Sequence, residues 1–279
     1  MPIRCLTDGN NAKINEYFYT TLLNYKMENY NRSQGFSNYT ILESKQIPAG
    51  AISKKFMSGV FLWMFAALGV STIFAFLFSG SADLAQMLYQ LTPKGPRLTG
   101  IGTLVAFSPL AFVLVMSFGL NKLSSTALSI IFIVYAAVMG MSLSTLTLTY
   151  TSASLMGCFA SASVMFGVMA LMGYTTDKDL TSFGSLMMMG LVGIIIASMI
   201  NFFLHSGALN YIISIVGVAV FLGLTAYDVQ KLKRIGAGIE FEGTAAGDTR
   251  KLMVMGALSL YLDFINLFIM LLNLFGKRK

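Results

Sequence analysis

The residues most able to do chemistry are two aspartates, Asp228 and Asp263, which lie in otherwise apolar stretches near the C-terminal end of the sequence. Asp263 is the one charged residue in the run 252–275. As a helix that rises ~1.5 Å per residue, this run crosses a hydrocarbon layer of ~30 Å and places Asp263 near its middle. An ionised carboxylate at that depth is costly unless it is paired, protonated or hydrated, so such acids usually serve a function.

Other polar residues share one face of the same predicted helix with Asp263. Their spacings of four, three and seven residues follow the helical period. The members of this polar stripe are Ser259, Asp263, Asn266 and Asn273. Lipid does not accept such a stripe, so we expect other helices to enclose it. We predict that Ser259, Asn266 and Asn273 line an ion path.

Asp228 ends the preceding apolar stretch, and the two stretches are predicted to form an antiparallel hairpin across a loop at 235–251. This arrangement brings the two carboxylates within ~7 Å of each other in depth. Two carboxylates in contact in a low dielectric cannot both ionise cheaply, so the pair shares a proton and titrates as a unit. When deprotonated, their oxygens are hard ligands that suit Ca²⁺. The sequence therefore predicts that Asp228 and Asp263 form a pH-sensing pair and a transient calcium site.

Other interpretations of the two acids remain open. Asp228 pairs with Lys231 one turn further along the helix, or Asp263 links two helices through a hydrogen bond to a Ser or Tyr. Two acids on neighbouring helices also occur in intramembrane aspartyl proteases, where one carboxylate activates water. Those enzymes carry Gly-x-Gly-Asp at the second acid, whereas this chain has Leu260-Tyr-Leu-Asp263, which leaves a substrate backbone little room. We therefore expect no enzyme and no cofactor.

The composition is that of an integral membrane protein, with 56% hydrophobic and 11% charged residues. Residues 1–55 are polar and are predicted to be a flexible cytoplasmic tail, and residues 56–279 a membrane domain. The expected fold class is an all-α membrane protein, a bundle of seven transmembrane helices. Two charge-free runs are too long for one crossing, so turns are predicted at 147–154 and at 205–210. The predicted spans are Phe56–Phe78, Leu98–Leu120, Thr126–Leu148, Leu155–Gly173, Ser185–Leu204, Tyr211–Tyr227 and Leu252–Phe275.

The formal charge of +7 comes from basic residues in tails and loops rather than from a basic folded face, so no nucleic-acid binding is expected. Lys and Arg gather in segments predicted to share a side with the N-terminus, which favours a cytoplasmic N-terminus. The terminal Lys277, Arg278 and Lys279 fall on the other side and oppose this trend. Cys5 and Cys158 share no metal-ligand or redox spacing, so no disulfide framework is expected.

Four segments resemble the Bax inhibitor family of multi-pass membrane proteins, most of all its bacterial branch: LTAYDVQKLK, LYLDFINLF, AAVMGMSLS and MALMGYTTDKDL. The resemblance covers residues 56–275. It implies a bacterial inner-membrane protein and a seven-helix bundle with the last helix central. It also implies a calcium leak governed by two aspartates, which match Asp228 and Asp263 in this sequence.

The resemblance has two departures and one alternative. The loop predicted between the two aspartate helices, at 235–251, looks long for the family. Some family members place an arginine inside the second helix to latch the first aspartate, whereas residues 98–120 contain no basic residue and Arg97 lies at their edge. Some bacterial relatives are linked to a membrane quality-control protease, so the alternative is a non-transporting interaction protein that restrains such a protease. The expected partners are therefore calcium ion, the lipid bilayer and a possible membrane protein. Only the interaction protein is expected to need the tail 1–55.

Overall fold

The computed structural model describes residues 50–92, 95–119, 123–242 and 246–279. Residues 48–279 form one compact unit. A second unit, residues 1–47, lies outside the described residues, and with it most of the predicted tail 1–55.

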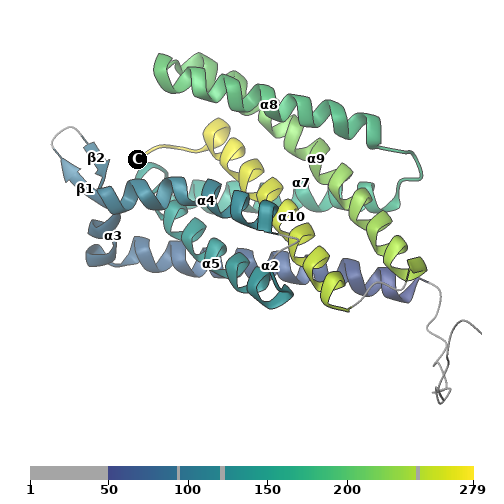
Figure 1. The fold of residues 1–279 in the computed structure, drawn as a ribbon. Coiled ribbons are helices and arrows are strands. Elements are labelled where there is room, and N and C mark those ends of the chain that lie inside the picture. The colour runs from purple at the N-terminus through teal and green to yellow at the C-terminus, as the bar shows by residue number, and fades with distance from the viewer. Residues whose placement is uncertain (1–49, 93–94, 120–122, 243–245) are drawn as a thin grey trace, which may run out of the picture. The chain divides into compact units, whose positions relative to one another are not determined.

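The described chain is helical apart from one short β-hairpin, which confirms an all-α membrane protein (Figure 1). Six of the described helices are long and apolar enough to cross a membrane: α2, α5 together with α6, α7, α8, α9 and α10. Helix α4, which covers the second predicted span, is not among them. The elements are α2 Ala51–Gly80, α3 Ala82–Leu88, β1 Tyr89–Thr92, β2 Gly95–Leu98, α4 Gly100–Gly119, α5 Ser125–Ser144, α6 Leu146–Thr149, α7 Ser152–Thr175, α8 Thr181–Leu204, α9 Gly207–Glu242 and α10 Ala246–Phe275.

The connection between α2 and α4 contains secondary structure that the sequence analysis did not predict. Helix α3 leads into the antiparallel strands β1 and β2, in which Gln90 lies opposite Arg97. Leu88 and Tyr89 are buried in a small apolar cluster with Ala85, against partly buried residues that include Val105 of α4. Burial of these side chains stabilises the hairpin against the start of α4. Leu98 therefore belongs to β2 and not to a membrane helix, as the second predicted span had it.

The predicted loop at 235–251 is wrong, because α9 continues to Glu242 and α10 begins at Ala246. Tertiary contacts hold this glycine-containing segment helical, since Gly236 packs against the start of α2 and Ile239 is buried. The carboxylate of Glu240 accepts hydrogen bonds from the Gly50 amide at 2.5 Å and the Ser53 amide at 3.2 Å. It thereby supplies acceptors to amides that the first turn of α2 leaves without partners.

Small residues allow close contact between several helices. A Cβ atom on Gly140 of α5 would clash with the main chain of Ser71 in α2. A Cβ atom on Gly173 of α7 would clash with the main chain of Ala226 in α9. Helices in lipid associate through such packing, because the hydrocarbon around them removes the hydrophobic drive.

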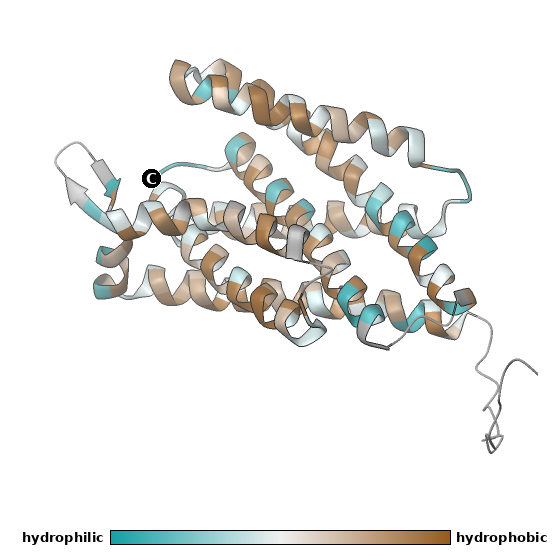
Figure 2. Cartoon of the chain, viewed as in Figure 1, coloured by the Kyte–Doolittle hydropathy of each residue, from teal (hydrophilic) through white to brown (hydrophobic). Residues whose placement is uncertain are grey.

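Helix α10 is enclosed by its neighbours, whereas α8 is mostly exposed. Helix α10 packs against α9, α2, α7 and α5. In its apolar 18-residue segment 61% of the residues are buried, compared with 6% in the corresponding segment of α8. Figure 2 shows that most residues of α8 are apolar, and many of its large apolar side chains are exposed. In a membrane such an apolar surface contacts lipid at no cost.

The C-terminal residues pair with the start of α7. The Thr151 amide donates to the Lys277 carbonyl at 3.1 Å, and the Lys279 amide donates to the Thr149 carbonyl at 3.0 Å. The predicted turn at 147–154 contains the short helix α6 and the non-helical residues Tyr150 and Thr151. The second predicted turn is confirmed at His205, which ends α8 in the left-handed conformation with a φ of 51°.

Candidate functional site

Asp228 and Ser259 meet where α9 and α10 pack against each other. The Ser259 hydroxyl donates a hydrogen bond to the Asp228 carboxylate. One turn away, Gly256 packs directly against the Leu232 side chain, so the two helices lie close together at this level. A cavity of about 290 Å³ opens beside the contact. Its lining residues are Asp228, Lys231, Leu232, Ile235, Leu252, Met255, Gly256, Leu258, Ser259 and Leu262.

Asp263 lies one helical turn beyond Ser259 on α10 and is deeply buried. Only 6% of its surface is exposed, and its Oδ2 atom has no hydrogen-bond partner among the described residues. A buried acceptor without a partner calls for a proton, a water molecule or a cation at that atom.

The cation associated with Asp228 comes from its own helix. Lys231 lines the same cavity as Asp228, three residues further along α9. The ion pairs in the described part of the chain do not include these two residues, and the hydrogen-bond partner of Asp228 is Ser259 instead. Arg97, the basic residue at the edge of the second predicted span, lies exposed in β2. A single lysine on α9 is thus the cation that the structure provides at this cavity.

The remaining members of the polar stripe lie further along α10 and have their own partners. The half-buried Asn266 donates its amide to the Leu262 carbonyl in the same helix at 2.9 Å. The Asn273 Oδ1 atom accepts a hydrogen bond from the Tyr150 hydroxyl at 2.9 Å, near the paired C-terminal residues. The lining of an ion path by Ser259, Asn266 and Asn273 stays a prediction.

The sequence reasoning missed a buried hydroxyl cluster that joins α10 to α2 and α5. The hydroxyls of Ser71 in α2 and Tyr261 in α10 lie 2.7 Å apart, and Ser71 also donates to the Ala136 carbonyl at 2.7 Å. The ring of Tyr135 lies 5.6 Å from that of Tyr261, and its hydroxyl has no partner among the described residues. The available signal was the position of Tyr261 between Ser259 and Asp263, because a buried Tyr hydroxyl needs a hydrogen-bond partner.

Just beyond Asp228, α9 is fixed to the connection between α7 and α8. The buried Gln230 donates to the Lys178 carbonyl at 2.8 Å and accepts from the Leu180 amide at 2.9 Å. Arg234 forms an ion pair with Asp179 at 2.7 Å. Hydrogen bonds from Thr181 and Arg234 hold the pKa of the Asp179 carboxyl well below its usual range. These contacts position the part of α9 that carries Asp228.

The oxygens at the site suit a passing calcium ion better than a resident one. Ca²⁺ takes six to eight oxygen ligands, and two carboxylates with one hydroxyl supply only part of such a shell. In the described residues no group of three or more His, Cys, Asp or Glu side chains is arranged to hold a metal ion. Any cation here would therefore keep some of its water.

Comparison with known proteins adds the family to this geometry. The family model described as inhibitor of apoptosis-promoting Bax1 matches residues 53–279. Inner membrane protein YbhL of Escherichia coli strain K12 is 42% identical over 224 residues, which cover 80% of this chain and 92% of YbhL. An uncharacterized protein of Rickettsia prowazekii is 39% identical over 81% of this chain and 91% of its own length. An uncharacterized protein of Caulobacter vibrioides is 36% identical over 91% of this chain and 100% of its own length.

Proposed function

The chain belongs to the Bax inhibitor family, and from this premise we propose that it is a pH-sensitive calcium leak channel governed by Asp228 and Asp263. The observation that carries the proposal is the contact of α9 and α10. There Ser259 donates to Asp228, and a buried oxygen of Asp263, one turn further along α10, has no partner among the described residues. In the proposed mechanism, the two carboxylates of the closed channel share one proton. Loss of that proton leaves two negative charges that repel each other and attract a cation.

Protons and calcium compete for the same oxygens, so calcium binding at the pair strengthens as the pH rises. Repulsion between the ionised carboxylates weakens the contact of α9 with α10 and widens the cavity beside them. Because the pair does not complete a calcium shell, the ion stays hydrated in part and leaves again. Binding that is favourable but incomplete is what conduction requires.

The same proposal includes a bundle of seven crossings in which α10 is the central helix and α4 supplies the seventh. Support comes from the two ends of α10. Its first residues follow α9, where Glu240 binds Gly50, and its last residues lead into the segment that pairs with Thr151. The described chain thus starts and finishes at opposite ends of α10, which supports an odd number of crossings.

We place the N-terminus in the cytoplasm and the protein in the bacterial inner membrane, the location that the name of YbhL gives for that relative. Support comes from a group of basic residues at the ends of α9 and α10, because Lys and Arg favour the cytoplasmic side. The group consists of Lys231, Lys233, Arg234, Arg250 and Lys251. Figure 2 shows hydrophilic residues at these ends.

Calcium flux into liposomes tests the proposal. Purified protein is reconstituted in vesicles that contain a calcium-sensitive dye, and the rate of calcium entry is recorded from mildly acidic to mildly alkaline pH. We expect a rate above that of protein-free vesicles, increasing with pH as protons leave the pair. A rate equal to that of empty vesicles at every pH contradicts the proposal and favours the non-transporting interaction protein.

A further inference from the structure

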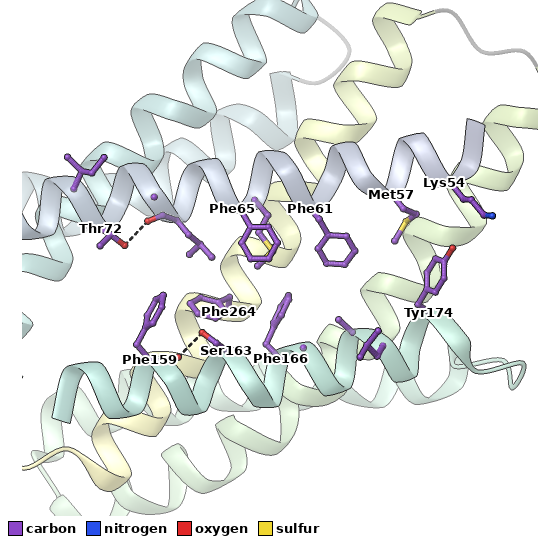
Figure 3. Close-up of a pocket in the computed structure, with 17 residues that line it drawn as sticks. Lys54, Met57, Phe61, Phe65, Thr72, Phe159, Ser163, Phe166, Tyr174 and Phe264 are labelled. Carbon is purple, nitrogen blue, oxygen red and sulfur yellow. Dashed lines mark hydrogen bonds between the residues drawn. The ribbon is translucent and has the colours of Figure 1, made fainter. Parts of the chain in front are cut away.

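A long apolar groove lies between α2 and α7, with Phe264 of α10 at its base (Figure 3). Its volume is about 830 Å³. Along α2 it extends from Lys54 to Ile73, a length of ~28 Å at the rise of an α-helix. The hydroxyls of Thr72 and Ser163 on its walls donate to carbonyls of their own helices, each at 2.8 Å. The walls therefore present a surface that suits hydrocarbon.

Two glycines widen the groove from opposite walls. Gly69 of α2 and Gly167 of α7 both line it, and a Cβ atom at either position would meet nothing within 4 Å. Gly140 and Gly173, by contrast, are required by tight helix contacts. A glycine inside a helix destabilises it relative to alanine, and at Gly69 and Gly167 helix packing does not offset that cost. Open space is what these two residues provide.

One end of the groove is positively charged. Lys54 lines this end, and its ammonium group has no hydrogen-bond or ion-pair partner in the part of the chain that the structure describes. Tyr174 lines the same end, as Figure 3 shows. The Lys233 ammonium group lies 5.2 Å from the centre of the Tyr174 ring and donates to the Tyr174 carbonyl at 2.8 Å. No charged residue lines the other end, around Thr72.

The groove is too small for another helix. A helix of this length, with side chains to a diameter of about 10–12 Å, takes up roughly 2,000–3,000 Å³. All the empty space in the groove, including its open side, amounts to about 1630 Å³, which is less than that volume. A lipid acyl chain is thinner, and half of a ~30 Å hydrocarbon layer is shorter than the groove. We propose that this groove binds one anionic phospholipid of the surrounding bilayer, with an acyl chain between α2 and α7 and the headgroup at Lys54.

Quenching of tryptophan by brominated lipids measures this binding. Trp63 is the one tryptophan of the chain, so a Trp63→Phe, Phe65→Trp protein carries a single reporter on the groove wall. It is reconstituted with dibrominated phosphatidylglycerol or dibrominated phosphatidylcholine. One lysine contact with an anionic headgroup predicts about fivefold stronger association of phosphatidylglycerol. Lys54→Gln is expected to remove that preference. Lys55→Gln, with the same charge change at an exposed residue outside the groove, is expected to keep it.

A second pair of variants tests the groove itself. Gly167→Leu fills the open space and is expected to reduce quenching by both lipids, whereas Gly157→Leu, on the same helix but outside the groove, is expected to leave quenching unchanged. Leucine favours a helix more than glycine does, so neither change should unfold α7. If the reporter disturbs the fold, native mass spectrometry of the protein without it measures phosphatidylglycerol retention in the same lysine and glycine variants. Equal affinity for the two lipids, equal losses in the two lysine variants, or full lipid contact in Gly167→Leu overturns the proposal.

Discussion

Replacement of Asp263 by leucine separates a functional acid from a structural one. Asp263 is 6% exposed, and one of its carboxylate oxygens has no partner in the described residues. A buried polar atom without a partner costs about 1–3 kcal/mol. Leucine has a similar size, removes that cost and places an apolar side chain at a buried position. If the acid is kept for function, Asp263→Leu should raise the free energy of unfolding by about 1–3 kcal/mol.

A thiol-reactive dye measures this change, because Cys158 is buried in the folded protein. The chain has two cysteines, so a Cys5→Ser background leaves Cys158 as the single reporter of unfolding. At about 2–4 °C per kcal/mol for a chain of this size, Tm should rise by roughly 2–12 °C. Asn266→Leu is the control. The Asn266 amide already binds the Leu262 carbonyl of its own helix, so no comparable rise is expected.

A lower Tm in Asp263→Leu would refute this reasoning. It would mean that Asp263 stabilises the bundle through a hydrogen bond to a neighbouring helix, which is the structural interpretation of the acid. An increased Tm together with loss of calcium flux would show that the protein keeps a destabilising group because its activity needs it.

Three further outcomes are expected. Asp228→Asn and Asp263→Asn should each abolish the pH dependence of calcium flux, because a shared proton needs two ionisable groups. Asp83→Asn, at an exposed position of α3, should leave that dependence intact. Unchanged pH profiles in both Asp228→Asn and Asp263→Asn would exclude the pair from the mechanism. Asp179→Asn should lower thermal stability at neutral pH. The Asp179 pKa is lowered by Thr181 and Arg234, so its contribution is present above the unfolded value of about 4 and is lost as the pH falls through the lowered value. Melting curves of both proteins should therefore converge on acidification, and a constant difference would contradict this assignment. Asp248→Cys in the Cys5→Ser background should resist an impermeant thiol reagent in intact cells, whereas His205→Cys should react; the reverse labelling would place the N-terminus outside.

Hydropathy predicted the long helices well, because it reports directly on which segments lipid accepts. The last helix ends at Phe275 as predicted, and α7 begins at Ser152, close to the predicted start at Leu155. The sequence predicted a loop from residue 235, whereas α9 continues to Glu242. Gly236 and Gly238 in this segment are weak helix formers. Contacts of this segment with α2 outweigh that local tendency, and a single sequence does not reveal them.

The two aspartates were accessible to sequence reasoning because a charge inside an apolar run stands out. Ser259 was also identified, although as a member of a stripe and not as the hydrogen-bond donor to Asp228. The partner of the Tyr261 hydroxyl was not accessible, because Ser71 lies 190 positions away in the chain and a single sequence does not show which distant residues meet. The groove was hidden for a similar reason, since Gly69 and Gly167 look like any other small residues of a membrane helix.

The hydrogen bonds of Glu240 to the first turn of α2 have a consequence for the order of synthesis. The Gly50 amide and the Glu240 carboxylate are 190 residues apart in the chain. At about 5–20 residues per second, a ribosome needs roughly 10–40 s after making Gly50 to reach Glu240. During this interval the N-terminal turn of α2 is already at the membrane without its acceptor. Formation of this bond thus marks the late stage at which α2 and α9 are joined, and in a chain truncated before Glu240 the start of α2 lacks this contact.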